Sequence, residues 1–297
     1  MTLSLEQYAL DGETVFTTIS NLPKRLRTMA KKIDKSFSFA DTDIEHAHKR
    51  FSSFEFECQV RLQLAKHKFD NPVAFEDSIE KKLRHGGTYQ DPITGKLREF
   101  DIRFSLTFAK SFSVILAIEC KRIGTYSPVL LTRSPRTRDE TRVDSFGNRL
   151  PRQFNQIYKA NEPVGKEIGQ FGKAEFGDKE IVEISDGTLY DKWSQALSSA
   201  NELCAEAHDN FCIGYPQLVL PILVVPENTL WTIDYTEEGI LAGRPKRRDF
   251  SPFYVDWPVT HPTKGIIGKL GHLEISTLNG LTVLIQERIN SIYELVS

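Results

Sequence analysis

The sequence predicts an α/β fold, because strand-like and helical patterns follow one another along a single chain. Two strand-like runs lie at residues 99–106 and 114–118, and a third lies at residues 218–225. Apolar residues at helical spacing cover residues 42–68 and 190–207. The length of 297 residues allows one large domain or two modest ones, and a hydrophobic content of 40% supports a substantial core.

The N-terminal segment, residues 1–36, contains a basic stretch and predicts an arm or a short pair of helices. We expect a domain over residues 37–297 to follow it. The first helix of that domain is predicted by three apolar residues at intervals of four, namely Phe56, Val60 and Leu64.

Glu57 lies on or beside this predicted apolar stripe, whereas Glu55 lies off it. A charged residue in that position is unusual unless it reaches a partner. Glu57 is therefore either a solvated residue, a partner for Arg61, or a side chain directed at a site formed by later parts of the chain.

The first two strand-like runs predict neighbouring strands that carry polar groups to one place. In residues 99–106 apolar and polar residues alternate, which puts Asp101 on the polar face. The run 114–118 is apolar on both faces and ends at Glu119 and Lys121, which share a face. Two carboxylates and an ammonium group would then converge in a metal site. Taken alone, the Glu119–Lys121 pair equally fits an exposed salt bridge at a strand end.

Asp101, the seventeen residues that follow it, and the triplet Glu119-Cys120-Lys121 resemble the signature of the PD-(D/E)xK nuclease superfamily. The resemblance extends upstream over residues 89–101, which read as a hairpin with turn residues Asp91-Pro92 and Gly95. The proline of the signature is absent, since Phe100 precedes Asp101. The resemblance covers roughly residues 50–225 and implies a restriction-endonuclease-like core, with a central mixed sheet flanked by α-helices and extra C-terminal strands.

The resemblance also implies a cofactor and roles for individual residues. Mg²⁺, for which Mn²⁺ can substitute, would be held by Asp101, Glu119, the carbonyl oxygen of Cys120 and a glutamate of the preceding helix, for which Glu57 is the candidate. Lys121 would orient the attacking water or offset negative charge on the phosphate. Gln195, on the helix predicted at residues 190–207, is a further candidate beside the site, although it equally fits a surface glutamine.

Residues 124–180 are rich in arginine, glycine and proline and show little periodicity, so the sequence predicts a long loop insertion there. Beside a nuclease centre such a loop would bind phosphates; otherwise it is a solvated loop. The candidate phosphate-binding residues are Arg133, Arg136, Arg138, Arg142, Arg149 and Arg152.

The C-terminal part predicts further strands and a last helix. Pro221 argues that the strand over residues 218–225 is an edge or bulged strand. Short strands are expected at residues 230–235 and 253–255, and a helix at residues 281–295.

Charge and cysteine content narrow the class of protein. The net charge of −2 excludes a uniformly basic surface, but a local basic cleft is sufficient for a nuclease. The four cysteines form no C-x-x-C pair, the N-terminus lacks the features of a signal peptide, and no apolar run could span a membrane. We therefore expect reduced thiols, no membrane contact and a cytoplasmic location.

The expected function is a metal-dependent endonuclease acting on nucleic acid, with DNA as the first choice and prokaryotic antiviral defence or DNA processing as the setting implied by the resemblance. Two alternatives stay open. One is a catalytically silent or partner-activated nucleic-acid-binding subunit of the same fold, and the other is a nuclease for RNA or branched DNA. A homodimer and a partner protein for targeting or activation are both compatible with the sequence.

Overall fold

The structure is a computed structural model that describes residues 54–65, 69, 80–108, 112–123, 128–147, 152–154, 157–173, 181–183, 187–209 and 215–296. The chain divides into two compact units, residues 1–52 and 53–297, and all described elements belong to the second. The predicted N-terminal arm, with its boundary at residue 36, lies outside the described residues.

The second unit contains helices and strands in alternation. The helices are α3 (Phe54–Ala65), α4 (Gly187–Asp209) and α5 (Gly280–Val296), with a 3₁₀ turn at Asp139–Thr141. The first strands are β1 (Glu80–His85), β2 (Thr88–Gln90), β3 (Leu97–Glu99), β4 (Ile102–Phe108), β5 (Phe112–Cys120), β6 (Val129–Pro135), β7 (Val143–Ser145) and β8 (Arg152–Phe154). The later strands are β9 (Pro163–Lys173), β10 (Ile181–Glu183), β11 (Gln217–Val225), β12 (Leu230–Asp234), β13 (Lys246–Arg247), β14 (Phe250–His261) and β15 (Gly265–Thr277).

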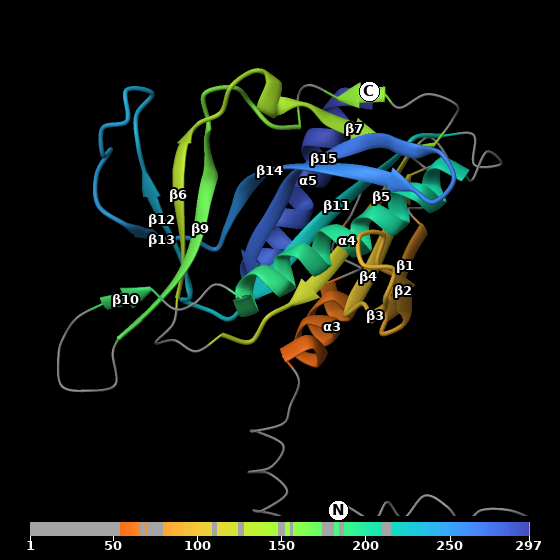
Figure 1. Cartoon of the computed structure of the whole chain (residues 1–297), viewed down its shortest axis with the longest axis horizontal. Coiled ribbons are helices and arrows are strands. Elements are labelled where there is room, and N and C mark those ends of the chain that lie inside the picture. Colours follow the sequence, from red (N-terminus) through yellow and green to blue (C-terminus); the bar gives the residue numbers. More distant parts are fainter. Residues whose placement is uncertain are drawn as a thin grey trace, which may run out of the picture. The chain divides into compact units, whose positions relative to one another are not determined.

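A large mixed sheet organises this unit (Figure 1). Its strands follow the order β1-β4-β5-β11-β15-β14-β9-β6-β12-β13, and β10 pairs with β9 outside this path. β11 is parallel to both β5 and β15, whereas the β4–β5 and β14–β15 pairs are antiparallel. The predicted α/β class, with a central mixed sheet flanked by helices, is therefore confirmed.

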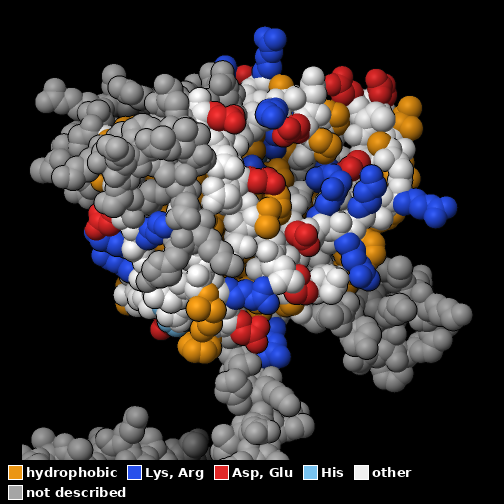
Figure 2. Space-filling model, turned by 180° about the vertical axis from the view of Figure 1, so that it is seen from behind, with side chains coloured by type: hydrophobic (Ala, Val, Ile, Leu, Met, Phe, Trp, Pro, Cys, Tyr) orange, Lys and Arg blue, Asp and Glu red, His pale blue; other side chains and the backbone are white. Residues whose placement is uncertain are grey.

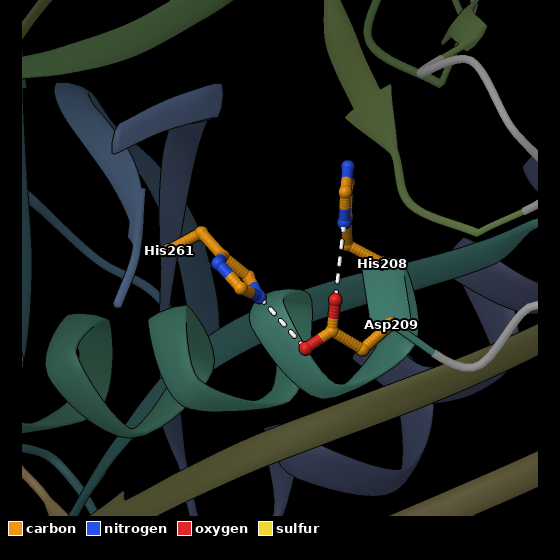
Figure 3. Close-up of side chains that lie close together, drawn as sticks. All are labelled: His208, Asp209 and His261. Atoms are coloured by element: carbon orange, nitrogen blue, oxygen red, sulfur yellow. Dashed lines mark hydrogen bonds and ion pairs between the residues drawn. The ribbon is translucent and has the colours of Figure 1, made fainter. Parts of the chain in front are cut away.

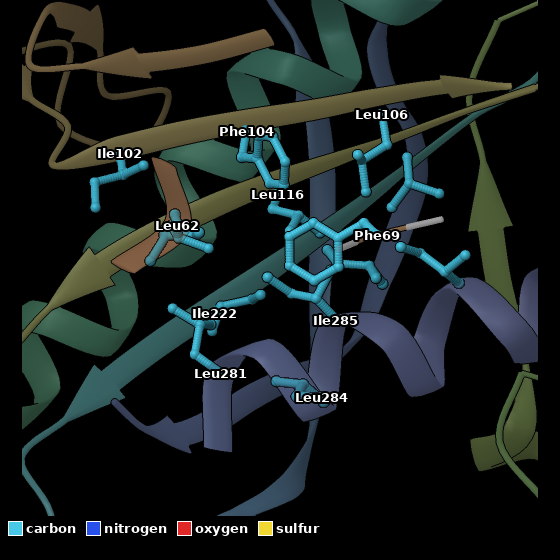
Figure 4. Packing of buried hydrophobic residues seen from close by; sticks show 14 of the residues in the cluster. Leu62, Phe69, Ile102, Phe104, Leu106, Leu116, Ile222, Leu281, Leu284 and Ile285 are labelled. Carbon is cyan, nitrogen blue, oxygen red and sulfur yellow. The ribbon is translucent and has the colours of Figure 1, made fainter. Parts of the chain in front are cut away.

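Two apolar layers cover opposite faces of the central strands (Figure 1). α3 and α5 pack on one face, and Figure 4 shows their side chains directed toward those of β4, β5 and β11. α4 packs on the other face through the residues predicted from its helical spacing, including Leu197, Ala200 and Cys204. β5 and β11 are covered on both sides, which explains their almost uninterrupted apolar sequences.

The prediction that Pro221 places its strand at an edge was wrong. β11 lies inside the sheet, where Pro221 pairs with Ala117 of β5. The ladder with β15 begins only at Ile222, so the missing N–H of Pro221 falls just before that ladder.

The prediction of a long loop over residues 124–180 was also wrong. β6 and β9 pair antiparallel over most of their length and join the large sheet, while β7 and β8 form a separate two-stranded sheet. β9 contains several glycines and charged residues and has no strand-like apolar pattern, so its place in the sheet is set by its partners.

The predicted apolar stripe of the first helix was wrong as well. Phe56, Val60 and Leu64 are exposed, and the residues of α3 that face the core are Phe54, Cys58, Leu62 and Ala65. This change of face alters which glutamate of the helix points toward the sheet.

The remaining predicted elements are present. β12, β14 and α5 match the strands and the helix expected in the C-terminal part. Cys58, Cys120 and Cys204 are free, buried thiols, and Cys212 lies outside the described residues. None of the helices in the described part of the chain is long and apolar enough to cross a membrane.

Candidate metal centre

Asp101 and Glu119 face each other across the start of β4 and the end of β5. The β4–β5 ladder pairs Ile102 with Ile118 and Arg103 with Ala117, so its next position brings Asp101 opposite Glu119. Side chains of directly opposed residues share a face, with Cβ atoms about 4.5–5.5 Å apart. With this register, seventeen residues between Asp101 and Glu119 place their two carboxylates opposite each other in the hairpin.

Asp101 is held in place by the backbone of the opposing strand. It lies in a bend just before β4, so the run predicted over residues 99–106 is two strands rather than one. The N–H of Cys120 donates a hydrogen bond of 2.7 Å to Oδ2 of Asp101, and Nζ of Lys192 lies 3.9 Å from the same oxygen. The side chain of Asp101 is 11% exposed, which makes it the part of the pair that solvent reaches.

Glu119 is fully buried, and neither of its carboxylate oxygens receives a hydrogen bond of ordinary geometry. Burial raises the pKa of Glu119 well above its usual value, and the Asp101 carboxylate raises it further, while Lys192 lowers it. A buried carboxylate without donors is costly, so this position favours either a proton or a cation.

Glu55, and not Glu57, is the glutamate of α3 that faces this pair. Burial and the charge of Asp101 raise the pKa of Glu55, whereas Lys192 lowers it, so Glu55 lies within electrostatic reach of both residues. Glu57 is exposed on the opposite side of the helix. The choice of Glu57 followed from the wrong apolar stripe, because a helix turned to bury Phe54 and Cys58 directs Glu55 toward the sheet.

Lys192 of α4 is the lysine that acts on the carboxylate pair in the described part of the chain, and it also acts on Lys121. Burial lowers the pKa of Lys121, Lys192 lowers it further, and Asp191 opposes the change. Lys121 therefore lies within electrostatic reach of Lys192, whose Nζ lies 3.9 Å from Oδ2 of Asp101. Nothing in the sequence marks Lys192 except its position three residues before Gln195, on the same side of the helix.

Gln195 holds the backbone that leads into Asp101. Its Nε2 donates a hydrogen bond of 2.8 Å to the backbone carbonyl oxygen of Glu99. The backbone carbonyl oxygen of Gln195 accepts one of 3.2 Å from the hydroxyl of Tyr89. Gln195 is therefore a positioning residue and not a ligand. Glu99 does not pair with Arg103, since the guanidinium of Arg103 contacts Glu202 of α4 at 2.5 Å.

The charges around the pair favour a cation. Glu55, Glu99, Asp101 and Glu119 contribute four carboxyl groups, while Lys192 is the ammonium group that acts on both Asp101 and Glu119. Hard divalent cations such as Mg²⁺ are held by one or two carboxylates together with water and phosphate oxygens. The donor-free oxygens of Glu119 beside Asp101 fit such an ion.

The arginines predicted to bind phosphates have other roles or fall outside the description. Arg133 is buried in a bidentate ion pair with Asp234, at 2.7 and 3.0 Å, and Arg136 is buried with its Nη1 3.0 Å from the carbonyl oxygen of Lys159. These two assignments were wrong, because both guanidinium groups are used inside the fold. Arg138 is exposed and Arg142 is half exposed beside Asp139. Arg149 and the side chain of Arg152 lie outside the described residues.

A second group of metal-ligating residues, His208, Asp209 and His261, lies where α4 ends beside the β14–β15 turn (Figure 3). Nε2 of His261 lies 2.7 Å from Oδ2 of Asp209, and Nδ1 of His208 lies 3.6 Å from Oδ1. Nζ of Lys264 lies 2.9 Å from Asp209 and 3.2 Å from Nδ1 of His208. Because an ammonium group already contacts two of the three ligand residues, we interpret this group as a clamp between α4 and the β14–β15 turn.

Comparison of the chain with protein-family models, curated proteins and solved structures gives no match.

Proposed function

We propose that this chain is a metal-dependent endonuclease of the PD-(D/E)xK type, with a restriction-endonuclease-like core and DNA as its substrate. The observation that carries the proposal is the opposition of Asp101 and Glu119 across β4 and β5, with Lys192 beside Asp101 and Lys121 within electrostatic reach of Lys192. Glu55 of α3 and Gln195 of α4 support it, because they occupy the places that the resemblance implies for a glutamate before the aspartate strand and a polar residue after the lysine.

In this proposal Asp101 and Glu119 hold Mg²⁺ or Mn²⁺, with the carbonyl oxygen of Cys120 as a third donor and Glu55 adding negative charge. The bound cation supplies a water molecule of lowered pKa and charge stabilisation at the phosphate. Lys192 restrains Asp101 and presents a positive charge to a phosphate group that reaches the exposed edge of the pair. Lys121, which follows Glu119 by two residues at the end of β5, would offset negative charge on the phosphate or orient the attacking water.

A basic edge strand offers a surface for the nucleic acid in place of the buried arginines. Arg244, Lys246 and Arg247 are exposed at the β13 end of the large sheet, and the guanidinium of Arg247 lies 4.9 Å from the centre of the Trp231 ring. A partly exposed aromatic side chain such as Trp231 next to guanidinium groups is typical of phosphate and base contacts. Elsewhere the charges alternate, and Figure 2 shows Lys and Arg interspersed with Asp and Glu over the described part of one face.

The chain connects this strand to the candidate metal centre over a short distance. Val224 pairs with Cys120, and its carbonyl oxygen accepts a hydrogen bond of 2.8 Å from the N–H of Lys121. Four residues separate Val225 from Leu230, the first residue of β12, so these two residues lie at most about 18 Å apart. β12 in turn pairs with β13 through Trp231 and Arg247, so the basic edge strand follows the candidate metal centre closely along the ladder of contacts.

The test is cleavage of linear, supercoiled and single-stranded DNA and of RNA, each with Mg²⁺, Mn²⁺ or EDTA. Asp101→Ala should abolish metal-dependent cleavage, and Lys192→Ala and Lys121→Ala should each reduce it by about 100-fold or more, as expected for charge stabilisation in a water-poor site. Lys96→Ala, at an exposed turn, serves as the matched control and should cleave at the wild-type rate. Cleavage by Asp101→Ala at the wild-type rate would refute the proposal.

One observation favours the alternative of a catalytically silent nucleic-acid-binding subunit. The side chain of Glu119 is 0% exposed, so a phosphate can approach the pair only from the side of Asp101. Metal binding without cleavage of any of the four substrates, together with binding of DNA that Arg247→Ala weakens, would select this alternative. Cleavage of RNA alone would instead select a ribonuclease.

A further inference from the structure

A small cavity of about 180 Å³ lies between α4 and the strands β1, β4, β5 and β11, away from the candidate metal centre. Its polar lining includes Lys82 and Arg84 of β1, Arg103 of β4, Glu206 of α4 and Gln217 of β11. The cavity contacts the second half of α4, whereas Lys192 belongs to the first half.

The strand register concentrates positive charge at this cavity. Arg84 lies directly opposite Arg103 in the antiparallel β1–β4 pair, and Lys82 lies two residues before Arg84 on the same face. Like charges in directly opposed positions are destabilising unless another group offsets them. Glu202 pairs with Arg103, and Glu80 pairs with Lys82, but Arg84 belongs to none of the ion pairs found within the described ranges.

Two buried hydrogen-bond donors at the cavity have no acceptor. Nε2 of Gln217 and Nε of Arg103 are both buried without a hydrogen-bond partner, and Gln217 as a whole is 5% exposed. Buried donors are nearly always paired in folded proteins, so these two donors favour an acceptor that the protein itself does not supply, either water or a bound anion. These donors come from two different strands and line the same cavity.

The carboxyl group at the cavity does not fully neutralise these cations. Burial and the neighbouring Glu202 raise the pKa of Glu206, although Arg103 and Arg84 act in the opposite direction. Glu206 therefore holds its proton more readily than an ordinary surface glutamate. A bound anion would offset the charges of Arg84 and Lys82 and accept from the two unpaired donors.

We propose that this cavity binds the phosphate group of a small molecule, held by Arg84, Arg103, Lys82 and Gln217. Several donors from three strands surround one small volume, which matches an oxyanion with three or four acceptor oxygens better than a flat carboxylate with two. Guanidinium groups are the preferred partners of phosphate oxygens in proteins. The binding of phosphate here does not depend on nuclease activity.

The experiment is a calorimetric titration of the full chain with inorganic phosphate at low ionic strength and in EDTA. We expect saturable binding of one phosphate per chain. Gln217→Leu removes the amide donor, and Arg84→Ala removes a guanidinium group that is exposed and free of ion pairs. Each variant should weaken binding by about tenfold or more, as for the loss of one charged or buried donor. Arg244→Ala, an exposed arginine on another part of the sheet, should change it less than twofold.

Two further measurements distinguish this cavity from the candidate metal centre, and free phosphate from the phosphate of a nucleotide. Lys192→Ala should bind phosphate as the wild type does, because Lys192 belongs to the candidate metal centre. Competition between inorganic phosphate and adenosine monophosphate distinguishes free phosphate from the phosphate of a nucleotide. Absence of saturable binding to either compound, or an equal loss in Arg244→Ala and Arg84→Ala, would overturn the proposal. Thermal unfolding of each variant establishes that a loss of binding is not a loss of fold.

Discussion

Replacing Glu119 with glutamine tests the physical basis of the candidate metal centre before any activity is known. Burial and the Asp101 carboxylate raise the pKa of Glu119 in the folded protein, while in the unfolded chain it has its ordinary value of about 4.3. The folded state therefore binds this proton more tightly. Its contribution to stability is fully present below the unfolded pKa and is lost as the pH rises through the folded pKa.

The magnitude follows from the linkage of one proton. Over the interval between the two pKa values, the free energy of unfolding of the metal-free protein should decrease by up to about 1.4 kcal/mol per pH unit because of Glu119 alone. Glutamine does not ionise, so Glu119→Gln lacks this pH-dependent contribution. In EDTA at pH 8 the variant should have a larger free energy of unfolding than the wild type, and that free energy should depend less on pH. A carboxylate in an ordinary surface position would give no such difference.

Urea unfolding followed by circular dichroism between pH 4 and pH 8.5 measures the stability of the two proteins at pH 8 and its dependence on pH. Addition of Mg²⁺ should reverse the order, because a cation that binds the folded wild type stabilises it by RT ln(1 + [Mg²⁺]/Kd), or about 1.4 kcal/mol at ten times the Kd. The free energy of unfolding of Glu119→Gln should increase little when Mg²⁺ is added. Parallel pH profiles of the two proteins in EDTA, or an equal effect of Mg²⁺ on both, would refute the reasoning.

Three further predictions follow from contacts described above. Glu55→Gln should weaken metal binding measured by calorimetry, whereas Glu57→Gln, on the exposed side of α3, should leave it unchanged. Arg133→Ala should lower the free energy of unfolding by about 1–3 kcal/mol, because it leaves the partly buried carboxylate of Asp234 without its partner, whereas the exposed Arg138→Ala should change it by less than about 0.5 kcal/mol. Asn201→Ala should lower the free energy of unfolding measured with urea by about 1–3 kcal/mol. The side-chain amide of Asn201 accepts a hydrogen bond from the N–H of Thr260 in β14 and donates one to its carbonyl oxygen, both at 2.8 Å.

The hairpin that carries Asp101 and Glu119 could be predicted because its information is local. Alternation in one strand and a fully apolar second strand act over short distances, and so do the turn residues Asp91 and Gly95 of the β2–β3 hairpin that precedes it. The structure agrees, with the Asp91 carboxylate accepting hydrogen bonds from two backbone N–H groups of the turn and Gly95 at φ +67°. The same locality made α4, β11 and α5 predictable.

The errors arose where partners distant in the sequence decide the structure. α3 has two apolar stripes of equal period, one through Phe56 and one through Phe54, and the packing of the second stripe in the core, with Cys58 beside Cys120, selects between them. β9 carries too few apolar residues to be read as a strand, but β6 and β14 complete its ladders. Lys192 looks like any lysine on the polar side of a helix, and its proximity to Asp101 depends on how α4 docks on the sheet.

The opposition of Asp101 and Glu119 also bears on the order of folding. The β4–β5 hairpin closes over a short stretch of chain, whereas Lys192 must arrive with α4 and the β5–β11 ladder joins Ser113 to Gln217. Short loops close early and long ones late, so the two carboxylates meet before the ammonium group that offsets them is in place. We therefore expect a stage of folding in which the negative charge at this hairpin is not yet balanced. Refolding should then be faster at mildly acidic pH or in the presence of a divalent cation, so that conditions of synthesis would influence how quickly the centre assembles.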